Sequence, residues 1–383
     1  MQIRFLTSLT QAPAAQWNAL CGPFYPFCRH EFLHALEASG SIGDGTGWQT
    51  QHLVVYEGDE LLAAMPLYLK THSYGEYVFD WSWADAYKRH GLNYYPKLIS
   101  AIPFTPCAGT RLLLSPSVDQ AQLLPVIIEE IKQHLHKLGA SSWHCLFPLA
   151  DSSEQLISQQ IPQRLGTQFH WFNRGYKTWE DFVATMTSRK RKSINKERRT
   201  VAEQGIRFSA LRANEIRAED WQLFYQFYCN TYLKRSGHTG YLTEEFFNLL
   251  RQTFAEYCLM IVAHKADEPI AAALFFIDRK TIYGRYWGCL AEYDFLHFET
   301  CYYQGIDYAI KHGLERFDGG AQGEHKIQRG FEPIRTYSNH YLVQPDFHNA
   351  IEKFLQSEKA SVELYMQDAK TYLPFKCSAD SRE

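Results

Sequence analysis

The sequence predicts an α/β protein made of two tandem copies of one domain. Residues 53–77 align without a gap on residues 262–286, at an offset of 209. After one residue drops out, the similarity resumes at an offset of 208. The recurring residues are Ala63-Ala64 with Ala272-Ala273, Tyr74-Gly75 with Tyr283-Gly284, Tyr94-Tyr95 with Tyr302-Tyr303, and Ala101-Ile102 with Ala309-Ile310. A repeat of this period indicates duplicated domains, and a length of 383 residues suits two or three of them.

The expected division is a first domain over residues 1–176, a basic helical connector over 177–205 and a second domain over 206–383. Each copy reads as an apolar hairpin followed by an aromatic-rich strand and a helix, which favours mixed central sheets flanked by helices. The alternative is a chance similarity between two β-hairpins.

Composition excludes several classes of protein. A net charge of −3 gives no overall nucleic-acid footprint. Nine cysteines without a C-x-x-C pair suit reduced thiols in a cytoplasmic protein. The N-terminal residues lack the apolar core of a signal peptide, and apolar runs such as Leu61–Leu69 are too short to span a bilayer.

In the first copy, periodicity and turn residues predict an alternation of helices and strands. Helices are expected over residues 12–20, 28–39, 87–101 and 123–138. Strands are expected over residues 51–56, 61–69, 77–83, 111–114, 143–147 and 169–176.

The connector contains the sequence SRKRKSINKERR, and Thr178 with Asp181 resembles a capping box at its start. Lys190, Arg191 and Arg198 are expected to bind an anionic group; the alternative is a solvated helix face. Further along, a strand is expected over residues 206–211 and a helix over 221–235. His238 then lies between two glycines in a loop, where it is a candidate substrate contact.

The densest mixture of titratable, aromatic and glycine residues lies between Tyr283 and Gly330. It reads as strand, polar junction, helix, strand and glycine-rich loop. In α/β proteins ligands bind where strands end, so we expect the site of the second domain here.

Several chemistries lack their usual motifs. Neither copy has a Q-x-x-G-x-G loop for the pyrophosphate of coenzyme A, and the corresponding junctions carry acidic residues. No cofactor is therefore expected, and the donor could be an aminoacyl-tRNA. His297 and Glu299 resemble part of a zinc deaminase signature without its cysteine pair, so no metal is expected. A G-x-S-x-G elbow is absent as well.

The remaining pattern suits acyl transfer to an amine, which needs a base and donors aimed at the developing oxyanion. The candidate catalytic residues are Arg285, His297, Glu299, Glu324, His325 and Lys326. The candidate substrate-binding residues are Lys190, Arg191, Arg198, His238, Tyr286, Trp287, Tyr302, Tyr303 and Arg329. Backbone N–H groups of Gly319–Gly323 are further candidate donors. For each residue the alternative is an ion pair or contact that only stabilises the fold.

The double copy, the basic connector, and the segments Phe169–Tyr176 and Gly323–Phe331 resemble the FemAB-like branch of the GNAT superfamily, which is related to peptidoglycan biosynthesis. This resemblance implies two tandem GNAT-like domains and, as in the Fem ligases, aminoacyl transfer from an aminoacyl-tRNA to a peptidoglycan precursor. The long coiled-coil insertion of some ligases is not apparent. The expected function is an acyl- or aminoacyltransferase; the alternative is a non-catalytic module that recognises a peptide or cell-wall precursor.

Overall fold

The computed structural model describes residues 1–321 and 323–376. The chain divides into two compact units, each assembled from separate segments. Unit 1 comprises residues 1–166, 241–246 and 335–363, and unit 2 comprises 167–240, 247–334 and the described residues from 364 onward. The division expected from the sequence was contiguous and placed residues 167–176 in the first domain, whereas here the connector and these residues belong to unit 2.

Unit 1 holds two groups of paired strands. The first has the order β1 (Gln2–Leu6), β3 (His52–Glu57), β4 (Glu60–Met65), β7 (Leu113–Leu114). The second has the order β15 (Glu332–Leu342), β8 (Ser142–Leu146), β6 (Lys97–Ser100), β5 (Tyr68–Lys70), β2 (Trp48–Thr50). The helices of this unit are α1 (Ala14–Cys21), α2 (His30–Ala38), α3 (Trp81–Arg89), α4 (Gln120–Leu138), α5 (Ala150–Ser158) and the first part of α12 (Pro345–Thr371).

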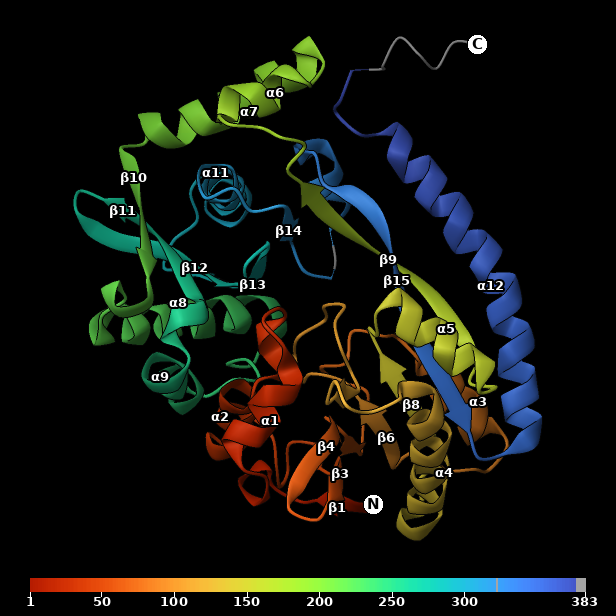
Figure 1. Cartoon of the computed structure of the whole chain (residues 1–383). Coiled ribbons are helices and arrows are strands. Elements are labelled where there is room, and N and C mark those ends of the chain that lie inside the picture. The colour runs from red at the N-terminus through yellow and green to blue at the C-terminus, as the bar shows by residue number, and fades with distance from the viewer. Residues whose placement is uncertain (322, 377–383) are drawn as a thin grey trace. The chain divides into compact units, whose positions relative to one another are not determined.

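Unit 2 contains one mixed sheet. Its order is β10 (Ile206–Arg212), β11 (Cys258–Lys265), β12 (Glu268–Ile277), β13 (Thr281–Cys289), β14 (Arg316–Asp318), β9 (Gln163–Phe172). Its helices include α6 (Trp179–Ala184), α7 (Ser188–Glu203), α8 (Ala218–Ser236), most of α9 (Glu244–Thr253), α10 (Leu296–Phe298) and α11 (Gln304–Lys311). In Figure 1, α8 and α11 lie on opposite sides of the strands β12 and β13.

The duplication is visible in the pairing of the two hairpins. In β3–β4, Val55 pairs with Ala63 and Tyr56 with Leu61. In β11–β12, Ala263 pairs with Ala271 and His264 with Pro269. Every one of these pairs is related by an offset of 208, and each hairpin has its single-residue bulge at the same place. The hairpins are therefore equivalent, and the sequence alignment at offset 209 was one residue out of register.

The repeat extends to the strands that follow each hairpin. β6 is antiparallel to β5 and parallel to β8, as β13 is antiparallel to β12 and parallel to β14. α4 lies between β6 and β8 in the chain, and α11 lies between β13 and β14 in the corresponding position. The prediction of two similar α/β units with mixed sheets is therefore confirmed.

The sequence prediction failed between residues 71 and 101. Tyr74-Gly75 lies in a turn after β5, whereas Tyr283-Gly284 lies inside β13, so these dipeptides are not equivalent. The expected strand 77–83 is irregular chain leading into α3, and the expected helix 87–101 ends at Arg89 before β6. Gly91 and Pro96 explain this early end, because glycine destabilises a helix and the residue before proline avoids helical dihedral angles. The match of residues 94–102 to 302–310 consequently pairs a strand region with a helix.

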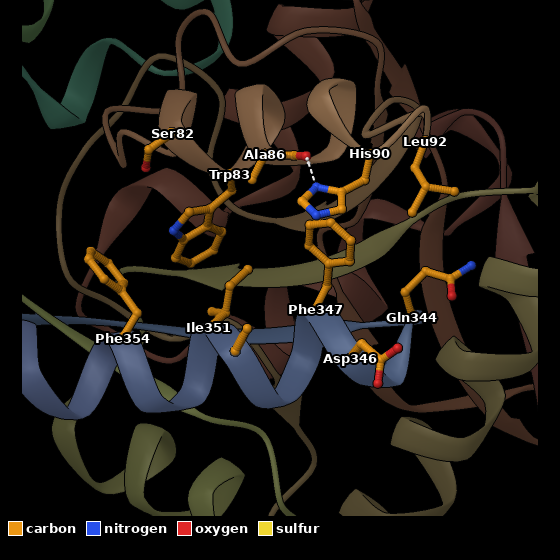
Figure 2. Close-up of a pocket in the computed structure, with 11 residues that line it drawn as sticks. Ser82, Trp83, Ala86, His90, Leu92, Gln344, Asp346, Phe347, Ile351 and Phe354 are labelled. Atoms are coloured by element: carbon orange, nitrogen blue, oxygen red, sulfur yellow. Dashed lines mark hydrogen bonds between the residues drawn. The ribbon is translucent and has the colours of Figure 1, made fainter.

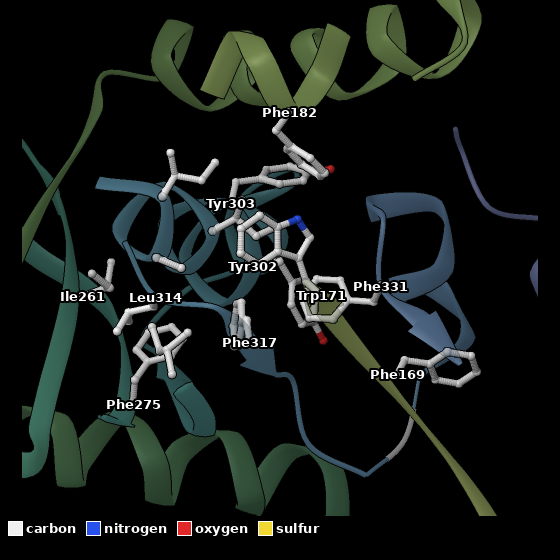
Figure 3. Close-up of a cluster of buried hydrophobic side chains, with 14 of the residues drawn as sticks. Phe169, Trp171, Phe182, Ile261, Phe275, Tyr302, Tyr303, Leu314, Phe317 and Phe331 are labelled. Atoms are coloured by element: carbon white, nitrogen blue, oxygen red, sulfur yellow. The ribbon is translucent and has the colours of Figure 1, made fainter. Parts of the chain in front are cut away.

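The core of unit 2 lies between its sheet and the helices α6, α7 and α11. Ala273, Phe275 and Ile277 alternate along β12 and share this core with Trp171 and Phe317. Figure 3 shows Phe182 from α6 meeting this cluster beside Tyr303. The core anchors the ends of β13 and β14, where the candidate site lies. Among the described residues, we find no helix with the length and hydropathy needed to cross a bilayer.

Candidate functional site

A bulge in β13 forms one wall of the candidate site. Leu274 of β12 pairs with Tyr286, but the next residue, Phe275, pairs with Gly284, so Arg285 is the extra residue. Such bulges leave a residue outside the ladder and commonly re-aim a side chain near a site. The Arg285 guanidinium donates to both carboxylate oxygens of Asp318, at 3.1 Å and 2.8 Å. The bulge and the end of β14 are thereby joined by a buried, two-pronged ion pair.

Asp318 is the centre of a buried polar cluster. Its Oδ1 lies 3.6 Å from Nε2 of His170 on the neighbouring strand β9 and accepts the backbone N–H of Gly320 at 2.9 Å. The Arg285 guanidinium holds the pKa of this carboxyl well below its usual range despite burial. Burial lowers the pKa of His170 to about 4, so its imidazole is neutral at pH 7. The Lys326 ammonium donates to Gly320 O at 2.9 Å, and burial lowers its pKa to about 8.

The helix after β13 presents His297 to two pockets. It begins at Leu296, contains a π-helical turn at Glu299–Tyr303 and continues as α11. A pocket of about 110 Å³ is lined by Arg285, Trp287, His297, Cys301, Tyr302 and Gly319. A second pocket of about 260 Å³ is lined by Lys234, Arg235, Trp287, Cys289, Glu292 and His297. His297 and Trp287 therefore belong to the walls of both, with ring centroids 5.3 Å apart.

His297 is held neutral in this position. Burial, assisted by the positive charge of Arg235, lowers the pKa of His297 to about 3. A neutral imidazole can accept a proton through one nitrogen while donating through the other. The Cys301 thiol also lines the smaller pocket, and burial raises its pKa well above the ordinary value, which argues against a thiolate nucleophile there.

The second pocket depends on a close approach of α8 to β13. A Cβ on Gly288 would lie 2.1 Å from the backbone carbon of Phe227, so only glycine fits at this crossing. Asn230 of α8 donates to the carbonyl of Cys289 at 2.6 Å. This packing sets the last turn of α8, with Lys234 and Arg235, over the end of β13.

The predicted site residues divide into two groups. Those that line the smaller pocket are Arg285, Tyr286, Trp287, His297 and Tyr302. His325 accompanies them, because its Nε2 lies 2.9 Å from the Tyr302 hydroxyl, and burial lowers its pKa to about 4. Lys326 is tied to the same loop through Gly320.

The other predicted residues point elsewhere in unit 2. Glu299 is buried against the connector, where it accepts from Arg198 Nε at 3.1 Å. Arg198 also reaches Asp307 at 2.6 Å. Glu324 accepts from the Tyr365 hydroxyl at 2.7 Å and is exposed. These carboxylates are engaged with side chains that lie outside the described pocket linings.

The remaining predicted contacts form links between elements. Arg329 donates to Glu197 of α7 at 2.9 Å, and the Tyr303 hydroxyl donates to the same carboxylate. Lys190 donates to the side chain of Gln328 at 2.9 Å. In the structure Arg191 is half-buried on α7. His238 lies in an exposed loop, where it accepts the Gly240 N–H at 3.0 Å. Gln322, within the expected Gly319–Gly323 donor loop, lies outside the described residues.

Sequence reasoning missed several residues of the site. Asp318 and His170 meet only because β14 and β9 are paired, with Asp318 opposite His170. Lys234 and Arg235 end a helix far from the glycine-rich loop in sequence. Asp318 had one usable signal, its position between a short strand and two glycines.

The sequence matches the FemAB-like family, described as peptidoglycan biosynthesis/recognition, over residues 8–377. No curated protein matches it significantly. Among solved structures it is similar to FemX, at 10% identity and a TM-score of 0.53, covering 92% of this chain and 100% of that one. It is also similar to the C-terminal domain of a protein assigned as a lysylphosphatidylglycerol synthetase from Agrobacterium fabrum, at 10% identity, a TM-score of 0.50 and coverages of 90% and 96%.

A tandem GNAT protein from the clavulanic acid biosynthesis pathway matches at 8% identity, with a TM-score of 0.47 and coverages of 90% and 99%. The likeness to FemX concerns the fold, which agrees with the two-unit α/β architecture described above. With a family match that spans nearly all of its residues, the chain belongs to the FemAB-like family.

Proposed function

We propose that the chain transfers an acyl or aminoacyl group to an amine, and that the reaction occurs in unit 2 at the paired pockets around His297. Family membership supports a transferase role. The observation that carries the site assignment is the position of His297, a neutral imidazole in the walls of two pockets that both border β13.

The chemistry follows from the groups around these pockets. The amine nitrogen attacks the ester carbonyl, a C–N bond forms, and the C–O bond to the donor breaks. The proton lost by the amine passes to the free imidazole nitrogen of His297 and then to the departing hydroxyl oxygen. The positive charges of Arg285, which lines the smaller pocket, and of Lys326, on the loop that follows β14, stabilise the oxyanion.

The donor in this proposal is an aminoacyl-tRNA, and no coenzyme A is required. The cations Lys234 and Arg235 on the larger pocket suit the terminal phosphates of such a donor. The acceptor is an amine of a peptidoglycan precursor, and the reaction takes place in the cytoplasm. The donor assignment rests on family membership and on the charge of the larger pocket. The acceptor and the compartment rest on family membership.

The test is a transfer assay with two donors. The full chain is incubated with a mixture of radiolabelled aminoacyl-tRNAs or with acetyl-coenzyme A, and a precursor peptide carrying a free ε-amine serves as acceptor. We expect label or mass to be added to the peptide from aminoacyl-tRNA. This transfer should be lost in His297→Ala and retained in His238→Ala. Transfer from acetyl-coenzyme A alone would reject the donor assignment. Binding of the peptide without transfer from either donor would favour a recognition module.

A further inference from the structure

The outer face of α7 carries a row of exposed cations. Arg189, Lys192 and Lys196 recur at spacings of three and four residues, which places them on one side of the helix, and all three are exposed. With the described residues they form no ion pair and no side-chain hydrogen bond. Arg199 continues the row but is paired with Glu203 at 3.5 Å. Arg189, Lys192 and Lys196 are called the outer cations below.

The opposite face of α7 accounts for the packing of this helix. Ile194 and Val201 are buried there, and Arg198 is bound to Glu299 and Asp307 as described above. In Figure 1, α7 lies on the outer side of α11. The outer cations are therefore on the face that is turned away from the core, and they add nothing to its packing.

The charge pattern of α7 is unfavourable for the helix itself. The helix holds seven basic and two acidic side chains, whereas the whole chain has a net charge of −3. Lys192 and Lys196 are like charges four residues apart, and Arg189 lies in the first turn, where the helix dipole disfavours a cation. That turn has no acidic residue and no side-chain cap from Thr187. Because these costs bring no gain in stability, they indicate a partner that carries negative charge.

We propose that the outer cations bind the phosphate backbone of the acceptor stem of the tRNA donor, while its aminoacylated end occupies the larger pocket. This inference rests on the proposed function, from which the identity of the donor comes. The row from residue 189 to 199 spans ten residue steps, or about 15 Å of helix. Contacts of Lys and Arg with phosphates supply most of the sequence-independent affinity for nucleic acids, and a row of them along one helix is typical of such a surface.

The C-terminal end of α7 lies next to the larger pocket. Gln204, which follows the helix, donates to the carbonyl of Asp294 at 3.1 Å, and the neighbouring Tyr293 lines that pocket. Val201 packs in one hydrophobic cluster with Leu296, which lines the pocket as well. The outer cations and the pocket thus belong to connected parts of unit 2, so that one RNA molecule can contact both.

A membrane surface suits this face less well than RNA does. Helices that lie on membranes combine basic residues with an apolar face turned to the lipid. The apolar residues of α7, Ile194 and Val201, are instead packed in the hydrophobic clusters of unit 2. None of the exposed large apolar side chains of the described chain lies on α7, and the exposed neighbours Ser193 and Asn195 are polar. This combination of charge and polarity favours phosphates in water.

The main groove of unit 1 offers a polyanion no comparable surface. It has a volume of about 640 Å³ between α3 and α12, and Figure 2 shows Trp83, Phe347 and Phe354 among its apolar walls. The Asp346 carboxylate in its lining repels phosphate. The exposed lysines on α12 are therefore suitable control positions for the loss of positive charge.

The first test measures the binding of uncharged bulk tRNA to the full chain over a series of salt concentrations. Lys192→Gln/Lys196→Gln should weaken binding about tenfold or more at ~0.1 M salt, and should reduce the slope of log K against log salt by about 0.7–0.9 for each cation removed. The matched control Lys353→Gln/Lys359→Gln removes two exposed charges from α12 and should leave binding unchanged. Equal affinities and equal slopes in the two double variants would overturn the proposal.

The second test separates the outer cations from the pocket. Lys192→Gln/Lys196→Gln should raise the KM for aminoacyl-tRNA about tenfold and leave the KM for an aminoacylated CCA trinucleotide unchanged, because the trinucleotide has no stem. The thermal midpoint of this variant should not fall, since the change removes a like-charge repulsion. Arg189→Gln/Lys196→Gln is the second pair to use if it does. A KM raised equally for both donors would place the effect in the pocket and overturn the proposal.

These measurements also distinguish this inference from the proposed function. Transfer that proceeds, with tRNA binding equal in the two double variants, would reject the outer cations and keep the reaction. Loss of tRNA binding in Lys192→Gln/Lys196→Gln, with no transfer by the parent from either donor, would reject the reaction and keep α7 as an RNA surface. Unchanged tRNA binding together with lost binding to phosphatidylglycerol vesicles would assign this face to a membrane and overturn the proposal.

Discussion

Arg285 and Asp318 form a two-pronged ion pair in which each side chain is only 2% exposed. Arg285 is the extra residue of the β13 bulge, and Asp318 ends β14. The pair therefore connects the irregularity that shapes the smaller pocket to the glycine-rich loop that carries Lys326. Its removal should affect both the stability of unit 2 and the geometry of the site.

Asp318→Asn should destabilise the protein by about 3–5 kcal/mol, because it leaves a buried guanidinium without its counter-charge. The measurement is urea unfolding at pH 7. The matched control is Glu315→Gln, which removes the partner of Lys280 from an exposed pair of unit 2, with side chains 62% and 55% exposed. That change should cost less than about 1 kcal/mol. Equal losses of unfolding free energy in the two variants would show that the buried pair stabilises the fold no more than the exposed pair does.

The same pair should persist to low pH. Because the pKa of Asp318 is lowered in the folded state, its contribution is present above the unfolded pKa and is lost as the pH falls through the folded one. The parent protein should therefore lose stability steadily below about pH 4, where an unfolded aspartate takes up its proton. Asp318→Asn should show a smaller loss over the same range. Urea midpoints measured between pH 2.5 and pH 5 test this difference.

His297 should make the free energy of unfolding rise with pH over a higher pH range. Its folded pKa of about 3 lies below the ordinary value, so between these values the unfolded state binds more protons than the folded state. Stability should increase from about pH 4 to pH 6.5, and His297→Gln should reduce the slope by up to about 1.4 kcal/mol per pH unit. His238→Gln, in the exposed loop, is the control for the substitution itself. An unchanged slope in His297→Gln would mean that the imidazole is not held neutral.

Arg198→Ala should lower the free energy of unfolding by about 1.5–3 kcal/mol, the size of hydrogen bonds to charged groups. The reason is that Glu299, whose pKa is raised by burial, would lose its main cation. Arg191→Ala on the same helix should have little effect on stability. Arg198→Ala and Arg191→Ala could instead both weaken the binding of an anionic donor at low salt without loss of stability. That result would show that these two arginines bind a ligand rather than stabilising the fold.

Sequence reasoning was successful where a local pattern determines the structure. It failed where the structure depends on pairing between strands that are distant in sequence. The capping box at Thr178, the length of α4 and the hairpin at residues 258–277 follow from side-chain periodicity and turn chemistry. The contact of His170 with Asp318 depends on β9 joining the sheet of unit 2, for which no local signal exists. Glu299 and Glu324 were proposed as bases because of their sequence neighbours, but the helix and loop aim them at Arg198 and Tyr365.

Gly288 offers a test of how the larger pocket is built. A methyl group there would meet the backbone of Phe227 at 2.1 Å, and backbone in the middle of α8 cannot move aside as a side chain can. Gly288→Ala should therefore displace α8, cost about 1–3 kcal/mol as overpacking does, and shift Lys234 and Arg235 away from His297. Gly284→Ala is the comparison, because its new methyl group would meet only side-chain rings, that of Phe317 at 3.1 Å and that of Phe275 at 3.4 Å, and no backbone. We expect Gly288→Ala to raise the KM for an aminoacyl-tRNA donor much more than Gly284→Ala, with the difference shrinking at high salt as phosphate contacts weaken. Equal KM values in the two variants at low salt would show that the α8 cations do not bind the donor.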